Sequence, residues 1–254
     1  MDAETPLTTA VLDGVLVITL NRPTKANARN RVMQSGLSAS VAEAAARTDI
    51  RAVVLTGAGQ RSFCGGMDLA ELQLSSAFGR ARIESDFALY DAMERCSKPI
   101  ISAVNGTAVG GGLDLVLASD LVVAERHAAF ACPEAKLGLV PLFAMLRLPG
   151  AIGRQRAAAM VLCCRTITAK EALAWGLVSE VVNTGASLQR ALILARELAE
   201  LDSTVVQIAK LALKGAPESL PRERAADLAT GLFETEALAA TVSRLRSPDR
   251  LRLG

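Results

Sequence analysis

The chain has 254 residues, of which 51% are hydrophobic and 3% aromatic, and its formal net charge is +2. This length fits one large domain, or one domain with an appendage, and it allows a sizeable buried core. Scattered basic residues and scarce aromatics disfavour a nucleic-acid surface or a membrane-surface protein, and no apolar run reaches the length that spans a membrane.

Cysteine usage and the N-terminus point to a reducing compartment. The five cysteines include an adjacent pair but no C-x-x-C pair, which indicates reduced thiols and no metal site. The first residues, Met1–Pro6, are short and acidic and do not resemble a signal peptide. We therefore expect a cytoplasmic protein. The only histidine, His127, follows charged neighbours and is expected at the surface, which disfavours histidine-based triads.

Apolar patterns and turn signals predict repeated strand–turn–helix units along the chain. The expected strands are a hairpin within Val11–Leu20, then Ile50–Thr56, a strand from Ile100 to the turn at Asn105-Gly106, Leu121–Ala124, Ala128–Ala131 and Leu177–Val182. The expected helices are Ala28–Arg47, Phe78–Cys96, one around Leu113–Leu117, one starting at Cys132 with Pro133 in its first position, Leu142–Leu148, Arg154–Leu162, Ala169–Trp175, Ser187–Leu201, Thr204–Lys214 and Arg222–Leu245. This order indicates an α/β core followed by an all-helical region.

Three glycines follow the strand that begins at Ile100 and precede a helix. The N–H groups of a helix's first turn lack intrahelical partners, and glycine lets a ligand oxygen approach them closely. Asp114 lies about one turn beyond Gly111, so the segment combines an anion site with a carboxylate. A tight turn with an aspartate that complements the helix dipole explains the same pattern. The spacing from Gly106 to Gly112 does not match the dinucleotide-binding fingerprint.

Six segments, in this order and at this spacing, resemble the crotonase (enoyl-CoA hydratase/isomerase) family. They are L-N-R-P-T-K-A-N-A at Leu20–Ala28, A-V-V-L-T-G-A-G at Ala52–Gly59, S-F-C-G-G-M-D-L at Ser62–Leu69, A-V-N-G-T-A-V-G-G-G-L-D-L at Ala103–Leu115, F-A-C-P-E-A-K-L-G-L-V-P at Phe130–Pro141 and I-T-A-K-E-A-L-A-W-G-L-V at Ile167–Val178. The resemblance implies an α/β spiral of β-β-α units, residues 1–186, and a C-terminal helical region, residues 187–254, that builds trimers, often paired into hexamers.

The resemblance also implies an acyl-CoA thioester as the substrate and no cofactor beyond its coenzyme A. It places an oxyanion hole at the N–H groups of Met67 and Gly111, and two catalytic carboxylates at Asp114 and Glu134. A first-turn glutamate that helps to cap a helix is the alternative role for Glu134. The substrate-binding positions that the resemblance implies are Lys25, Cys64, Gly66, Asp68, Leu69, Gly110, Phe143 and Met145.

Two departures from the family pattern bear on the reaction. Position 114 is aspartate where hydratases usually have glutamate, which withdraws the carboxylate by one methylene. The segment Pro141–Pro149 lacks the usual glycine pair and is one residue short, so Phe143 and Met145 either narrow the acyl pocket or fill the core. We expect an enoyl-CoA hydratase; the alternatives are an enoyl-CoA isomerase or other enolate chemistry, and a family member that binds acyl-CoA without turnover.

Overall fold

The computed structural model describes residues 5–73 and 75–214. The chain divides into two compact units, one that ends at Ala199 and one that begins at Glu200. The helix expected at Arg222–Leu245 lies outside the described residues. None of the helices in residues 5–73 and 75–214 is long and apolar enough to cross a membrane.

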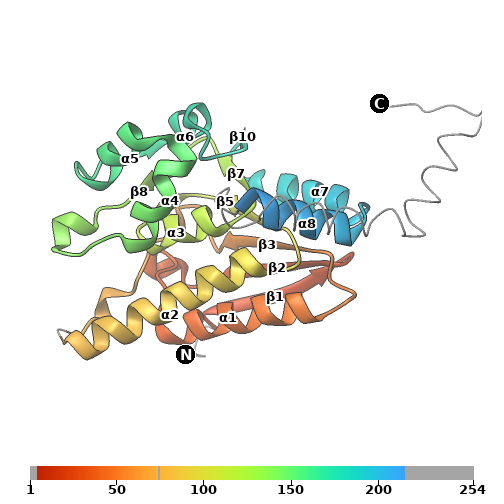
Figure 1. Ribbon diagram of the computed structural model, residues 1–254, viewed down its shortest axis with the longest axis horizontal. Coiled ribbons are helices and arrows are strands. Elements are labelled where there is room, and N and C mark those ends of the chain that lie inside the picture. The colour runs from red at the N-terminus through yellow and green to blue at the C-terminus, as the bar shows by residue number, and fades with distance from the viewer. Residues whose placement is uncertain (1–4, 74, 215–254) are drawn as a thin grey trace, which may run out of the picture. The chain divides into compact units, whose positions relative to one another are not determined.

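Within the described residues, the larger sheet has the strand order β1-β2-β3-β5-β7-β10 (Figure 1). Its strands are β1 (Leu7–Leu12), β2 (Val15–Leu20), β3 (Ala52–Gly57), β5 (Ile100–Val104), β7 (Leu121–Glu125) and β10 (Glu180–Val182). The β1–β2 hairpin is antiparallel, and every other pairing in this sheet is parallel. Strands buried on both faces give continuous apolar runs, which is why β3 and β5 were predictable from the sequence.

A smaller sheet lies beside it, with the order β4-β6-β8-β9 among the described strands. Its strands are β4 (Ser62–Cys64), β6 (Thr107–Val109), β8 (Ala129–Ala131) and β9 (Ile167–Thr168). Strands of two or three residues are too short to show a period, so β4, β6 and β9 were not expected. The glycines connect a strand directly to a helix, as expected, but this strand is β6 and not the one that begins at Ile100.

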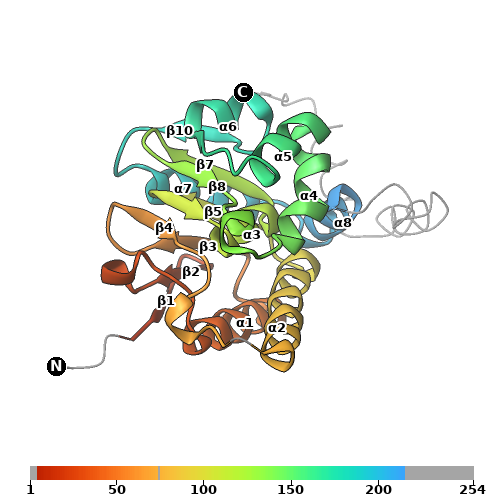
Figure 2. The same cartoon turned by 90° about the vertical axis from the view of Figure 1, so that its left-hand side faces the viewer.

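The helices complete a repeating β-β-α path. They are α1 (Arg31–Ala46), α2 (Ser76–Arg95), α3 (Gly111–Ala118), α4 (Leu142–Ile152), α5 (Arg154–Val161), α6 (Ala169–Trp175), α7 (Ser187–Ala199) and α8 (Ser203–Lys214), with 3-10 turns η1 (Pro23–Lys25), η2 (Leu69–Glu71) and η3 (Glu134–Leu137). The successions β3-β4-α2 and β5-β6-α3 each cross from one sheet to the other before a helix, and α1 and α2 lie side by side (Figure 2). The expected spiral of β-β-α units is confirmed.

Several boundaries differ from the sequence prediction: β1 begins at Leu7, α1 at Arg31 and α2 at Ser76. The helix expected from Cys132 is the single 3-10 turn η3, and Pro133 precedes it as the N-cap residue. Helix α4 continues through Pro149 and ends before Gly153, whose positive φ of 82° does not suit a helix. The last strand is the short β10 and does not begin at Leu177.

Alternating residues of the larger sheet point into two cores. Leu16 and Ile18 of β2 join the main core, whereas Val15 and Val17 face a second core on the opposite side of the sheet. Ala191 and Ala195 of α7 close that second core. The apolar face of α7, which begins the region expected to form trimers, is therefore covered by the chain's own larger sheet. The boundary at residue 186 and the trimerisation role of residues 187–254 stay predictions.

Candidate functional site

Two glycine-containing segments meet beside the N-terminus of α3. Gly66 and Gly110 have φ angles of 89° and 54°, which residues with a side chain rarely adopt. A Cβ on Gly66 would lie 2.8 Å from the Val109 carbonyl oxygen and 3.2 Å from the Gly111 nitrogen. The segments that carry Met67 and Gly111 therefore touch, although they are far apart in the sequence.

The N–H groups of Met67 and Gly111 are both left available to an acceptor. In the bridge between the segments of Arg29 and Met67, the Arg29 N–H donates to the Gly66 oxygen at 2.7 Å and the Asp68 N–H donates to the Arg29 oxygen at 3.0 Å. The Met67 N–H faces away from this pairing. Gly111 is the first residue of α3, where an N–H has no intrahelical acceptor.

Asp114 lies in the first turn of α3 and is 9% exposed. Its Oδ2 accepts a hydrogen bond from the Tyr90 hydroxyl at 3.3 Å, and its Oδ1 is buried without a partner in the described residues. Burial raises the pKa of Asp114 from 3.8 to about 7; the Arg29 guanidinium opposes this rise, and the charges of Glu134 and Asp86 add to it. Asp114 therefore exchanges its proton near neutral pH.

Glu134 approaches the same helix N-terminus from η3. A Cβ on Gly110 would lie 2.6 Å from Glu134 Oε1, so the carboxylate packs directly on the glycine backbone. Its Oε2 is buried and has no partner among the described residues, and burial raises the pKa of Glu134. The structure thus brings Asp114 and Glu134 to one place, and each keeps one oxygen uncommitted.

A buried arginine, which the sequence analysis did not single out, lies behind this site. Arg29 is 1% exposed, and its guanidinium donates to Gln34 Oε1 and to the Tyr90 hydroxyl oxygen, each at 2.7 Å. Its Nη1 also lies 3.3 Å from Asp86 Oδ1, an ion pair across to α2. Arg29 directly follows the first segment of family resemblance, and nothing in the local pattern distinguishes it from an exposed residue before a helix.

Several residues expected to bind the substrate differ in how far they are buried and in their polar contacts. Cys64 is fully buried in the main core, and burial raises the pKa of its thiol. The Asp68 carboxylate forms an ion pair with Arg22 at 2.7 Å and caps η2 through the Ala70 N–H. Leu69 and Lys25 are exposed. A contact between any of these residues and a substrate stays a prediction.

The two side chains expected at the acyl end of the pocket point in different directions. Phe143 is 3% exposed, and its ring lies 4.4 Å from that of Tyr90, centroid to centroid. Met145, two residues further along α4, is 39% exposed. Phe143 therefore lies one residue away from Asp114, through Tyr90, whereas Met145 faces out of the core.

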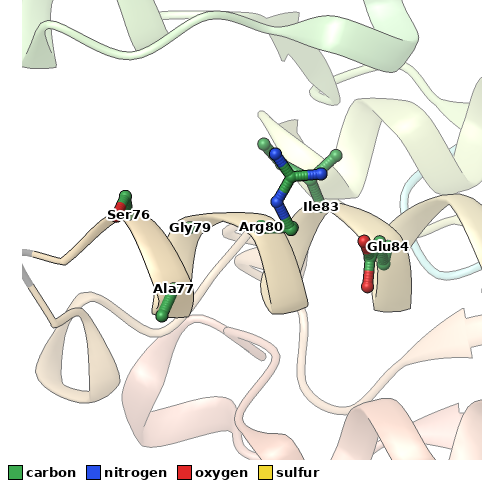
Figure 3. Close-up of a pocket in the computed structure, with 6 residues that line it drawn as sticks. All are labelled: Ser76, Ala77, Gly79, Arg80, Ile83 and Glu84. Carbon is green, nitrogen blue, oxygen red and sulfur yellow. The ribbon is translucent and has the colours of Figure 1, made fainter.

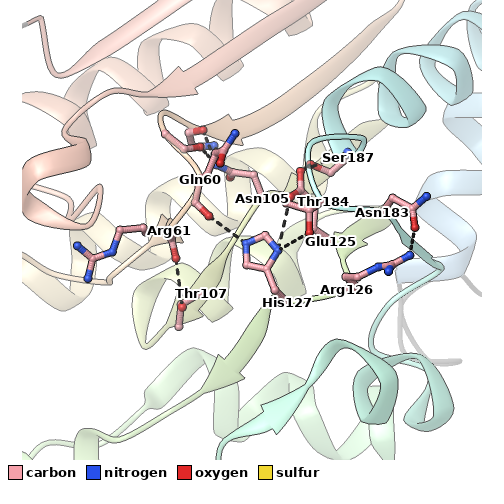
Figure 4. Close-up of polar contacts among 12 residues, drawn as sticks. Gln60, Arg61, Asn105, Thr107, Glu125, Arg126, His127, Asn183, Thr184 and Ser187 are labelled. Atoms are coloured by element: carbon pink, nitrogen blue, oxygen red, sulfur yellow. Dashed lines mark hydrogen bonds and ion pairs between the residues drawn. The ribbon is translucent and has the colours of Figure 1, made fainter.

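His127 lies in a separate polar cluster (Figure 4). Its Nε2 donates to the Gln60 carbonyl oxygen at 2.9 Å, and its Nδ1 lies 3.3 Å from the Thr184 hydroxyl and 3.7 Å from Glu125 Oε2. The Ser187 hydroxyl donates to Glu125 Oε1 at 2.8 Å. Because Ser187 contacts the carboxylate rather than His127, the cluster lacks the order of a serine–histidine–acid triad.

A surface hollow on the first turns of α2 has no comparable chemistry. It is lined by Ser76, Ala77, Gly79, Arg80, Ile83 and Glu84 (Figure 3). All six residues belong to one helix, so no polar groups converge on it from different elements. Groups of three or more histidine, cysteine or acidic side chains that could hold a metal ion are also absent from the part of the chain that the structure describes.

Comparisons with known proteins agree with the motifs. Residues 11–243 match the model of the enoyl-CoA hydratase/isomerase family. The chain is 41% identical over 210 residues to a mevalonyl-coenzyme A hydratase of Beauveria bassiana, which covers 78% of this chain and 75% of that protein. It is 37% identical over 247 residues to a 2,3-dehydroadipyl-CoA hydratase of Escherichia coli, and this match covers 92% of this chain and 94% of that protein.

Solved structures show the same fold. DspI of Pseudomonas aeruginosa superposes with a TM-score of 0.88 at 31% identity, covering 99% of this chain and 98% of that one. An enoyl-CoA hydratase of Bacillus anthracis superposes with a TM-score of 0.87 at 28% identity, covering 94% of this chain and 96% of that one. The family match, the shared fold and the paired carboxylates beside two free N–H groups lead to one conclusion: the chain belongs to the enoyl-CoA hydratase/isomerase family.

Proposed function

We propose that this protein is an enoyl-CoA hydratase, which reversibly adds water across the double bond of a 2-enoyl-CoA thioester. The observation that carries the proposal is the pair Asp114 and Glu134, two carboxyl groups beside the N-terminus of α3 that each keep one oxygen without a partner. Two such oxygens can hold one water molecule between them. Coenzyme A enters as part of the substrate, and the proposal needs no other cofactor.

The N–H groups of Met67 and Gly111 serve as the oxyanion hole. When water adds to the β-carbon, negative charge develops on the thioester oxygen of the resulting enolate. Two donors fixed by the backbone stabilise that charge without having to reorganise, and one such donor is typically worth about 3 kcal/mol in the transition state. The contact between the Gly66 and Gly110 segments supports this pairing.

The two carboxyl groups then carry the protons. The water oxygen bonds to the β-carbon and its proton passes to one carboxylate, while the other carboxyl group protonates the α-carbon. A pKa of about 7 keeps both forms of Asp114 present near neutral pH, so this residue can take or give a proton. Burial of Glu134 shifts its pKa in the same direction.

Further parts of the proposal concern the rest of the substrate. Lys25, exposed on η1, contacts the phosphates of coenzyme A, and the backbone of Gly66 and Gly110 forms the floor beneath the thioester. Phe143 limits the acyl group to small or flat chains, because its ring packs on Tyr90 next to Asp114. The chain assembles as a trimer or a dimer of trimers and acts in the cytoplasm.

Steady-state hydration of crotonyl-CoA, followed by loss of the enoyl-thioester absorbance, tests the proposal. Glu134→Gln should abolish hydration, and Asp114→Asn should lower kcat by about 100-fold or more, because acid–base assistance is typically worth about 10²–10⁴. Glu84→Gln, which neutralises an exposed carboxylate on α2, is the matched control and should retain full activity. If the folded Asp114→Asn variant hydrates crotonyl-CoA as fast as the wild type, the catalytic role proposed for Asp114 is wrong. If the wild type isomerises a 3-enoyl-CoA but hydrates no 2-enoyl-CoA, the protein is an isomerase.

A further inference from the structure

Three buried side chains from different elements form a hydrogen-bonded chain that ends at the candidate catalytic aspartate. Arg29 precedes α1, Tyr90 lies on α2 and Asp114 on α3. Arg29 Nη2 lies 2.7 Å from the Tyr90 hydroxyl oxygen, which lies 3.3 Å from Asp114 Oδ2. Arg29 and Tyr90 are each 1% exposed, so water does not compete for these contacts.

The chemistry of the three side chains fixes which group donates and which accepts in each hydrogen bond. A guanidinium has donors and no acceptor, so the Tyr90 oxygen accepts from Arg29. The single hydroxyl proton of Tyr90 is then left to donate to Asp114 Oδ2. A proton bound to Asp114 must therefore be on Oδ1, the oxygen that is buried and has no partner among the described residues. The arrangement selects one of the two carboxyl oxygens for proton transfer.

Arg29 also contacts both halves of the candidate oxyanion hole. Its backbone pairs with the segment of Met67 through the bonds to Gly66 and Asp68. Its Nη2 lies 2.1 Å from the point where a Cβ of Gly111 would be, so the guanidinium packs against that glycine. Gln34, Tyr90 and Asp86 hold the guanidinium in place, which leaves it little room to shift.

We propose that Arg29 is a positioning residue for the reaction, which acts through the Tyr90 hydroxyl to fix Asp114 with Oδ1 as its proton-carrying oxygen. The proposal rests on the proposed hydratase function only for its kinetic consequences. The hydrogen bonds from Arg29 to Tyr90 and from Tyr90 to Asp114 are present whichever enolate reaction the site performs.

The charged surroundings of Asp114 define what each variant changes. Asp114 interacts with Arg29 before α1, with Tyr90 and Asp86 on α2, and with Glu134 on η3; the thiols of Cys64 and Cys132 also lie in its field. Of these, Arg29 and the Tyr90 hydroxyl lower the pKa of Asp114, whereas Glu134 and Asp86 raise it. Loss of either lowering group must therefore move the protonation of Asp114 to higher pH.

The experiment compares Arg29→Met, Arg29→Lys and Tyr90→Phe in the full-length protein. Infrared difference spectra across pH, assigned with Asp114→Asn, measure the protonation of Asp114 without reference to activity. Arg29→Met and Tyr90→Phe should raise its midpoint by about one pH unit or more and lower kcat for crotonyl-CoA at least tenfold, with a smaller change in KM. Arg29→Lys, which keeps a buried cation, should stay closer to the wild type. Arg47→Met, which changes a half-buried arginine at the C-cap of α1, should change nothing.

Two outcomes separate this inference from the proposed function. A raised midpoint in a protein that does not hydrate any enoyl-CoA supports the inference and contradicts the hydratase proposal. An unchanged midpoint in both Arg29→Met and Tyr90→Phe, with native circular dichroism, overturns the inference whatever the activity.

Discussion

The buried Asp114 should lower the free energy of unfolding at neutral pH, and its replacement by asparagine should therefore raise it. Burial raises the pKa of Asp114 from 3.8 to about 7 in the folded protein, so the folded state binds this proton more tightly than the unfolded state does. Stability then falls as pH rises from about 4 to about 7, and it stays low above that range. At 1.36 kcal/mol per pH unit, the upper bound of the loss is about 4 kcal/mol.

Asp114→Asn removes the ionisation and keeps the size of the side chain. Its amide oxygen can still accept the Tyr90 hydroxyl, and its NH₂ takes the place of the protonated Oδ1. The variant and the wild type should therefore unfold with similar free energies near pH 4, where Asp114 is neutral in the folded state. Near pH 8 the variant should be more stable by up to about 4 kcal/mol, although it should be nearly inactive.

Urea unfolding at pH 4.5, 6 and 8, at one protein concentration, measures this difference. Glu84→Gln is the control, because an exposed carboxylate should give no pH-dependent difference. A wild type that is as stable as Asp114→Asn at pH 8 would refute the reasoning. So would a difference of the same size at all three pH values, since a steric effect does not depend on pH.

The remaining predictions concern other parts of the molecule. Ser187→Ala should lower the free energy of unfolding by about 1.5–3 kcal/mol, because it removes a hydrogen bond to the buried Glu125 carboxylate; an unchanged urea midpoint would contradict this. Phe143→Ala should shift the kcat/KM preference toward longer enoyl-CoA chains and cost about 3–5 kcal/mol of stability; an unchanged chain-length profile in the folded variant would assign Phe143 to the core alone. Light scattering at micromolar concentration should give the mass of a trimer or a hexamer, and a monomer would contradict the assembly.

Features that follow from the local backbone were predictable from the sequence. Gly110 must adopt a positive φ and leave room for the Glu134 carboxylate, whereas the glycine cluster had indicated either a tight turn or the close approach of a ligand oxygen. The buried strand β3 gave an uninterrupted apolar run because both of its faces lie in a core. The catalytic roles expected for Asp114 and Glu134 came from the family resemblance and stay predictions, and the structure adds that both residues lie beside the same helix end.

Features that depend on tertiary contact were not predictable in the same way. Arg29 is buried because α2, some 60 residues further along the chain, supplies its partners Tyr90 and Asp86. Phe143 and Met145 were paired in the expected acyl pocket, yet positions two apart on a helix face different directions. The helical region from residue 187 was expected to pack on other copies of the chain, whereas Ala191 and Ala195 of α7 pack on the chain's own sheet.

The aspartate at position 114 gains a physical explanation from these buried contacts. The family resemblance marks it as one methylene shorter than the usual glutamate, so its carboxylate is withdrawn toward the helix. In that withdrawn position its Oδ2 meets the Tyr90 hydroxyl, and Arg29 lies behind that hydroxyl. A glutamate at this position would move the carboxylate about 1.5 Å further along the side chain. Arg29, Tyr90 and Asp114 therefore form one hydrogen-bonded set, in which the shorter acid is linked to the buried cation through the tyrosine hydroxyl.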